Sequence, residues 1–216
     1  MKRLSTLFFS VLILFSCQKE IEMNDTESTL EFNTKDYIIA TEGSYWVYEN
    51  YTVDVNGVEE LLPELDTIKC LGYEELNGEQ YIKYYKSYNP LFHSYMRDSN
   101  GYVVDQFGKV QFTLKNQGEV FNSGEISGLL NQEVSVKNVN QDLSIEAGSF
   151  ETVNVEAVYS YLDGSSFNAC NEQEVRFNTY YTKGVGKVWI EYGYSTELIN
   201  KCKHRIRKLK SYHIAN

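Results

Sequence analysis

The chain is a succession of short runs rich in β-branched and aromatic residues, separated by turn-forming residues. Asn77-Gly78 and Asn100-Gly101 each stand between two such runs, and an Asn-Gly pair in that position is a strong hairpin signal. The 18 tyrosines and 11 phenylalanines also favour strands. No long segment repeats its apolar residues with a helical period, so a parallel sheet with crossover helices is excluded.

These runs predict a mostly β, antiparallel domain of about a dozen strands. Gly124–Gln132 is the one segment of the first half that predicts a helical turn or two. The predicted strands are Ser44–Val53, Leu65–Tyr73, Glu79–Tyr88, Phe92–Asp98, Gly101–Asp105, Lys109–Leu114, Glu133–Val139, Asp142–Glu146, Phe150–Leu162, Glu174–Thr182, Lys187–Tyr194 and His204–Ile214.

The first 16 residues have the pattern of a secretory signal peptide. Lys2 and Arg3 precede an apolar run, Leu7–Phe15, which is too short to cross a bilayer as a helix. Leu14–Cys17 resembles the lipobox of bacterial lipoproteins, which implies that the Cys17 thiol carries a diacylglycerol, that cleavage occurs before it, and that the new amino group is acylated, with palmitate among the chains. Several acyl chains would hold the protein stably at a membrane. An ordinary secreted protein with a cysteine at this position is the alternative.

The next 20 residues, 17–36, predict an acylated anchor followed by a flexible, polar and acidic tether. Residues 37–216 predict a single β domain, since no repeat or internal linker divides them. Cleavage after Ser16 removes two basic residues and no acidic one, which leaves 18 basic against 30 acidic residues. A chain with that charge of −12 is not expected to bind nucleic acid.

Three segments together resemble uncharacterised lipoproteins of Bacteroidetes: Gly43–Glu49 ("GSYWVYE"), Ser144–Val155 ("SIEAGSFETVNV") and Tyr180–Gly193 ("YYTKGVGKVWIEYG"). The resemblance implies a single, strongly curved antiparallel sheet, an open half-barrel distantly similar to that of LolA-like lipoprotein carriers. Gln18–Glu20 also resembles the signal that sends such lipoproteins to the cell surface. We expect an outer-membrane lipoprotein on the periplasmic face or the surface.

The cysteines of the domain predict one disulfide. The Lys183–Lys187 turn should place Cys170 and Cys202 at one edge of the sheet, at a separation that a disulfide can bridge. Cys70 would then be a free, buried thiol, although a pairing of Cys70 with either of the others is the rival. Cys202 and His204 could share a strand face, but two ligands do not make a metal site. We expect no metal and no cofactor.

Two surface features have competing interpretations. Tyr81 and Tyr85 share one face of their strand and Tyr84 and Tyr88 the other, so the rings either pack or line a groove. The basic residues of Lys201–Lys210 either contact anionic lipid or protect an exposed edge strand.

The remaining motifs of the sequence indicate no catalytic activity. Asp66-Thr67-Ile68 matches a short O-glycosylation pattern but lies within a predicted strand, and the acidic pairs Glu59-Glu60 and Glu74-Glu75 predict a solvated surface. No nucleophile-elbow motif is present. We therefore expect no catalytic residues and a non-enzymatic envelope protein that binds or carries a hydrophobic ligand. The alternative is a structural accessory subunit that docks to another envelope protein.

Overall fold

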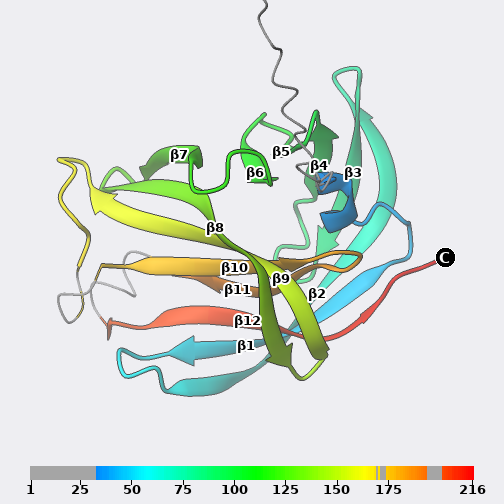
Figure 1. Cartoon of the computed structure of the whole chain (residues 1–216). Helices are drawn as coiled ribbons and strands as arrows, with labels where there is room; N and C mark the ends of the chain where they lie inside the picture. Colours follow the sequence, from blue (N-terminus) through cyan, green and yellow to red (C-terminus); the bar gives the residue numbers. More distant parts are fainter. Residues whose placement is uncertain (1–32, 169, 171–173, 194–200) are drawn as a thin grey trace, which may run out of the picture. The chain divides into compact units, whose positions relative to one another are not determined.

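All strands that the structure describes belong to one antiparallel sheet (Figure 1). The computed structural model describes residues 33–168, 170, 174–193 and 201–216. Cys17, the signal peptide and the tether up to residue 32 lie outside these residues. The strands are β1 (Tyr45–Val53), β2 (Glu59–Leu76), β3 (Glu79–Lys86), β4 (Ser94–Ser99), β5 (Tyr102–Asp105), β6 (Val110–Thr113), β7 (Val120–Ile126), β8 (Leu130–Ile145), β9 (Gly148–Tyr161), β10 (Arg176–Thr182), β11 (Gly186–Tyr192) and β12 (His204–His213).

The sheet is two meanders joined at the middle. Its spatial order is β6-β5-β4-β3-β2-β1-β12-β11-β10-β9-β8-β7. The chain therefore starts at the centre, runs out to one edge, crosses to the other edge and returns. The first and last strands are neighbours, and their pairing runs from Tyr45 opposite His213 to Val53 opposite His204.

The sheet curves strongly, so that its two edges approach each other (Figure 1). Bulges contribute to this curvature because each extra residue bends its strand. One lies in β2, where Cys70 pairs with Tyr84 but Tyr73 pairs with Ile82, and the glycine within it, Gly72, has a φ of 82°. At the edges, the side-chain amide of Asn122 on β7 donates a hydrogen bond to the Val110 carbonyl on β6 at 2.8 Å. The predicted single curved antiparallel sheet is confirmed.

The predicted turns form as hairpins. Asn77 and Gly78 both have positive φ, as do Asn100 and Gly101, which is the geometry of the type I′ turn. The "KGVGK" segment joins β10 to β11, with φ of 75° at Gly184.

Gly124–Gln132 is not helical, so that prediction is wrong. Gly124–Ile126 ends β7 and Leu130 begins β8. Between them Ser127 and Gly128 have φ of 54° and 68°, which makes another tight hairpin. The helix that the structure does describe is a single 3-10 turn, η1 (Thr34–Tyr37). It begins three residues before the predicted domain boundary, and its Thr34 is buried. No helix in the described part of the chain has the length and apolar character needed to cross a bilayer.

The basic cluster near the C-terminus does not lie on an edge strand, so that interpretation is also wrong. β12 is hydrogen-bonded on both sides, to β1 and β11. Its charges are instead paired across the sheet: Lys208 contacts Glu59, and Lys210 Nζ lies 2.6 Å from the Glu49 carboxylate.

The central strands bury large side chains on the inner face of the curve. The main cluster contains Trp46, Tyr48, Cys70, Ile82, Tyr84, Val185, Val188 and Leu209. Burial of each large apolar side chain contributes on the order of 1.5–3 kcal/mol. A second cluster, centred on Phe112 and Tyr181, packs between the two edges.

Candidate functional site

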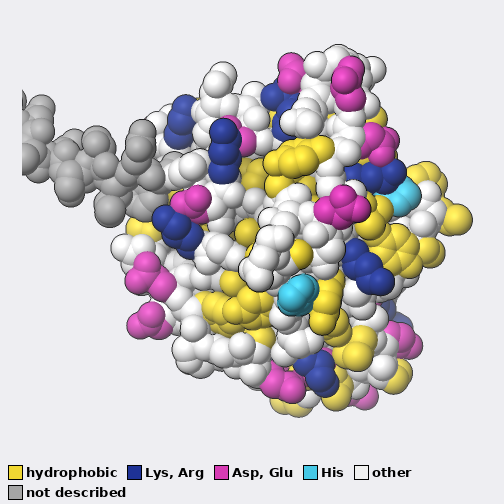
Figure 2. Space-filling model, turned by 90° about the vertical axis from the view of Figure 1, so that its right-hand side faces the viewer, with side chains coloured by type: hydrophobic (Ala, Val, Ile, Leu, Met, Phe, Trp, Pro, Cys, Tyr) yellow, Lys and Arg dark blue, Asp and Glu magenta, His cyan; other side chains and the backbone are white. Residues whose placement is uncertain are grey.

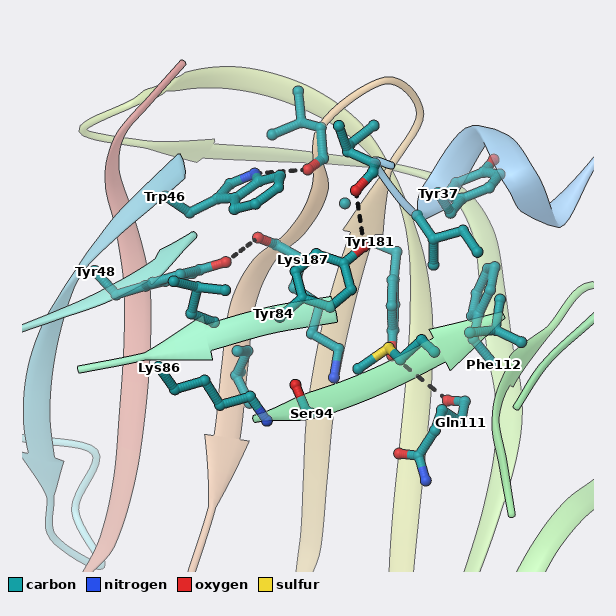
Figure 3. A pocket seen from close by; sticks show the side chains of 18 of the residues that line it. Tyr37, Trp46, Tyr48, Tyr84, Lys86, Ser94, Gln111, Phe112, Tyr181 and Lys187 are labelled. Carbon is teal, nitrogen blue, oxygen red and sulfur yellow. Dashed lines mark hydrogen bonds between the residues drawn. The ribbon is translucent and has the colours of Figure 1, made fainter. Parts of the chain in front are cut away.

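The inner face of the sheet contains a cavity of about 100 Å³. Its wall is mainly aromatic and aliphatic, and the rings of Trp46, Tyr48, Tyr84, Phe112 and Tyr181 line it (Figure 3). The volume is of the same order as that of an engineered apolar cavity of about 150 Å³ that binds benzene. We refer to this space as the inner cavity.

Strand alternation explains most of the lining. Side chains two residues apart share a face, so Trp46 and Tyr48 on β1 point inward together. Tyr84, Lys86 and Tyr88 follow the same rule along β3 and its continuation, and all three line the inner cavity. The predicted sharing of a face by Tyr84 and Tyr88 is therefore correct, and the face is that of the cavity.

Lys187 enters the inner cavity because of a bulge. Tyr180 pairs with Trp189, but Tyr181 pairs with Lys187, so β11 has one extra residue at this point. The extra residue reverses the alternation. As a result Lys187 and Ile190, three residues apart, both line the cavity, and Val188 between them is fully buried.

The two lysines of the inner cavity have no carboxylate partner within the described chain. Each lies near an aromatic ring instead: Lys187 Nζ is 5.4 Å from the centre of the Tyr181 ring, and Lys86 Nζ is 6.0 Å from that of Tyr88. Burial, together with the positive charge of the nearby Arg207, lowers the pKa of Lys187 to about 8. Burial, Lys187 and Arg207 lower the pKa of Lys86 to about 8 as well.

The polar groups of three aromatic side chains in the cavity wall donate hydrogen bonds to backbone carbonyls, and these bonds hold the rings in place. The Trp46 indole donates to the Val185 carbonyl at 2.8 Å, and the Tyr48 hydroxyl donates to the Lys187 carbonyl at 2.9 Å. The Tyr84 hydroxyl donates to the Ile39 carbonyl at 2.8 Å. Burial raises the pKa of Tyr48, Tyr84 and Tyr181, so these phenols stay neutral at physiological pH.

Ser94 is different, because its hydroxyl oxygen is buried and has no hydrogen-bond partner within the described chain. Ser94 begins β4 and lines the inner cavity. Figure 3 shows its hydroxyl beside the end of the Lys86 side chain, with the side chain of Lys187 reaching into the same part of the cavity. Buried hydroxyls normally have a partner.

Arg207 on β12 lies beside this group but is neutralised. Its guanidinium is 2.7 Å from the Asp66 carboxylate and lies over the rings of Tyr88 and Tyr192, 3.9 and 4.6 Å from their centres. Asp66 is thus a buried structural residue. Thr67 of the possible glycosylation motif lies in the middle of β2, where its carbonyl accepts from the Ser87 amide.

A short strap crosses one side of the inner cavity. It consists of η1 and the two residues that follow, Ile38 and Ile39, both of which line the cavity. The Gly184 amide donates to the Asp36 carbonyl at 2.8 Å, and Lys183 Nζ lies 2.8 Å from the Asp36 carboxylate. The strap is therefore attached at both η1 and Ile39.

The structure contains the disulfide between Cys170 and Cys202, with 5.5 Å between the Cα atoms. Cys70 is the free, buried cysteine of the described chain. Cys202 is therefore not available to a metal, and the ring of His204 packs on Phe177. Among the described residues no group of three or more His, Cys, Asp or Glu side chains could hold a metal ion.

Sequence reasoning missed the cavity residues Lys86, Ser94 and Lys187. Lys86 could have been found, because it stands between Tyr84 and Tyr88 in "YYKSY" and must share their face. Nothing in the sequence marks the bulge that turns Lys187 inward.

Comparison with known proteins gives structural neighbours but no family. No family model matches the chain, and no curated protein matches it. Two solved structures are similar in fold. One is a Bacteroides fragilis NCTC 9343 protein named as an exported protein with a YmcC-like fold, with 12% identity and a TM-score of 0.47. The other is named as a lipoprotein of Parabacteroides distasonis ATCC 8503, with 13% identity and a TM-score of 0.42. Each alignment covers 82% of this chain and 98% of the other. With TM-scores below 0.5, neither likeness bears on the function of this chain.

Proposed function

We propose that the protein is a lipid-anchored, non-enzymatic protein of the bacterial envelope that binds a small, partly hydrophobic ligand in the inner cavity. The observation that carries the binding proposal is an aromatic cavity that contains two lysines and a buried hydroxyl. Within the described part of the chain, the lysines have no carboxylate partner and the hydroxyl has no hydrogen-bond partner. Ligand sites are typically apolar hollows with a few converging polar groups. A volume of about 100 Å³ suits a short ligand or one end of a longer one, and not a whole lipid.

Native mass spectrometry of the mature chain tests the binding proposal. The chain would carry Cys17→Ser, so that no acyl chain of its own occupies the inner cavity. We expect a bound small molecule that is lost when Tyr84→Ala opens the cavity wall, and retained in Tyr73→Ala, whose side chain is 58% exposed on the same hairpin. Protein that is always recovered without a ligand, and that takes up none of the amphiphiles named below, would contradict the proposal.

The anchor is proposed from the sequence of Leu14–Cys17. We expect Cys17→Ala to abolish incorporation of labelled palmitate and to leave the protein unprocessed or released from the membrane fraction. Wild-type protein expressed in the same cells is the control. Equal labelling of the variant and the wild type would overturn the assignment of Cys17.

Docking to another envelope protein is the second candidate function. Figure 2 shows hydrophobic side chains gathered between charged groups on one face. Large apolar side chains are also exposed at loop tips: Leu91 and Phe107 are each 85% exposed and Phe92 is 68% exposed. The β3–β4 and β5–β6 connections that carry them lie at the same end of neighbouring antiparallel strands. Crosslinking in cells should recover one partner that Phe92→Ser and Phe107→Ser abolish and Tyr84→Ala does not.

A further inference from the structure

The inner cavity has a positively charged end in a negatively charged protein. The chain has a net charge of −10, and several lysines on its surface pair with carboxylates: Lys83 Nζ lies 2.6 Å from Glu74, and Lys183 and Lys210 have similar contacts. Lys86 and Lys187 differ in that each points into the cavity, lies near an aromatic ring and has no carboxylate partner among the described residues. Burial of a cation without a partner is costly, so this arrangement favours an anion between them.

The buried hydroxyl of Ser94 supplies a second, independent feature. It can donate a hydrogen bond, and the carbonyl of Lys187 on the cavity wall is already occupied by Tyr48. Two ammonium groups and one hydroxyl therefore act as donors to the same part of the cavity (Figure 3). A carboxylate or phosphate provides the matching acceptors, and hydrogen bonds to a charged acceptor are the strong ones.

We infer that the inner cavity selects an amphiphilic anion, whose carboxylate or phosphate lies between Lys86 and Lys187 and accepts from Ser94, and whose apolar part packs against Trp46 and Ile68. The inference rests on the proposed binding function and names the chemical class of its ligand. Uncharged amphiphiles would leave the two ammonium groups and the hydroxyl unpaired, so they bind more weakly.

Proton uptake follows from the same geometry. Burial and the positive charge of Arg207 hold the pKa values of Lys86 and Lys187 near 8, and the charge of Lys187 also lowers the pKa of Lys86. Among the described residues, the other ionisable groups that line the cavity are the phenols of Tyr37, Tyr48, Tyr84, Tyr88 and Tyr181, whose pKa values are raised. Asp66 pairs with Arg207. An anion between the lysines offsets their repulsion and raises both pKa values. Binding at pH 8.5 therefore takes up protons.

Fluorescence titration of the mature Cys17→Ser chain tests the selection. Trp189→Phe removes the tryptophan on the outer face, so that Trp46 in the cavity wall reports binding. The probes are octanoate, octyl phosphate and 1-octanol at pH 7, which share an alkyl chain and differ in the head group. We expect both anions, or the one whose head fits, to bind at least tenfold more tightly than the alcohol. The stronger anion shows whether the site suits a carboxylate or a phosphate.

Matched lysine variants show whether the charge acts in the cavity. Lys86→Gln and Lys187→Gln should each weaken binding of the preferred anion by about tenfold and leave 1-octanol unchanged. Lys83→Gln is the control, because Lys83 lies on the outer face of the same strand as Lys86 and pairs with Glu74. Circular dichroism verifies that each variant is folded. Calorimetry at pH 8.5 in two buffers of different ionisation enthalpy should give an uptake of up to about 1.5 protons per anion, because lysines with a pKa of about 8 are already about one-quarter protonated at this pH.

The outcomes separate the two proposals. Equal affinity for octanol and the anions, unchanged anion binding in the Lys86→Gln/Lys187→Gln double variant, or zero proton uptake would each overturn the inference and leave cavity binding intact. Failure of all three probes to bind, together with ligand-free protein in native mass spectrometry, would overturn cavity binding itself and the inference with it.

Discussion

Arg207 links the inner cavity to the core of the sheet. Its ion pair with Asp66 has side chains only 13% and 9% exposed, and the Asn50 amide oxygen accepts from its Nε at 3.2 Å. Breaking a pair of this kind leaves the other charge buried without a partner, which is more costly than the loss of the attraction itself.

We predict that Asp66→Ala lowers the free energy of unfolding by about 3 kcal/mol. Glu60→Ala is the control, because that glutamate is 74% exposed and lies 3.7 Å from Lys203, and its loss should cost less than about 1 kcal/mol. Urea denaturation of both variants measures the difference. Equal costs would mean that water reaches the Asp66 pair as freely as the surface pair.

Residue-level rules predict part of the candidate site. Alternation places Lys86 with Tyr84 and Tyr88, and it also places Cys70 with Ile68, both of which pack in the main core cluster. It fails for Lys187, because an unmarked bulge changes the face on which a side chain lies. Ser94 could not be recognised either, since its significance is a missing partner, and that depends on every neighbouring strand.

At the scale of single elements, turn chemistry decides what could be predicted. Asn-Gly pairs correctly predict the β2–β3 and β4–β5 hairpins. Ser127-Gly128 makes the same kind of turn but stands in "ISGLL", whose apolar spacing also fits a helix. Local spacing gave the wrong answer there, because pairing of β8 with β9 over most of its length fixes the segment as a strand.

Two glycine substitutions distinguish the hairpin from a helix. Gly128→Ala should destabilise the protein by about 1–2 kcal/mol, because φ is 68° at this position. Gly124→Ala lies in β7 with ordinary φ and open space around an added Cβ, so it should be neutral or stabilise by up to about 1 kcal/mol. Thermal melting of each variant gives the sign. Stabilisation by both changes would instead fit a helix.

The disulfide joins the segment before β10 to Cys202, two residues before β12. It closes a loop with a sequence separation of 32 residues, and loss of such a crosslink costs about 3–4 kcal/mol in the chain-entropy model. We expect Cys170→Ser/Cys202→Ser to lower stability by this amount and to be insensitive to reductant. Cys70→Ala keeps the disulfide and should lose as much stability on reduction as the wild type does. Denaturation with and without dithiothreitol makes the comparison. A crosslinked peptide containing Cys70 in non-reducing mapping would contradict the pairing.

For the whole molecule, buried cations and buried phenols set the pH dependence of stability. Lys86 and Lys187 have pKa values of about 8 when folded against 10.5 for the free side chain. Below pH 8 the folded and the unfolded chain both hold these lysine protons. Between about 8 and 10.5 the unfolded chain holds more, so stability rises with pH. Above pH 10 the sign reverses, because Tyr48, Tyr84 and Tyr181 ionise only after unfolding.

We therefore predict a stability maximum between about pH 8 and 10.5, above the usual range of about 5 to 8. Lys86→Met/Lys187→Met should remove the rise from pH 7.5 to 9.5 and keep the fall at higher pH. Urea midpoints at constant ionic strength over this range test it, with Lys83→Met as the control. If the stability of the wild type fell steadily above pH 7, the two ammonium groups would have to be well solvated in the folded protein.

The central pairing of β1 with β12 has a consequence for how the chain acquires its structure. Residues 54–203 separate β1 from its neighbour β12 along the chain. Synthesis proceeds from the N-terminus, so β1 is complete long before β12. Until the final strand arrives, the middle of the future sheet presents an unpaired edge, a template for pairing with other chains. Most other neighbours in the sheet are hairpins of low contact order and can form locally and early. The slow and vulnerable step is the pairing of β1 with β12 at the centre of the sheet. A chain that lacked residues 204–216, and with them the whole of β12, would be left as two separate meanders.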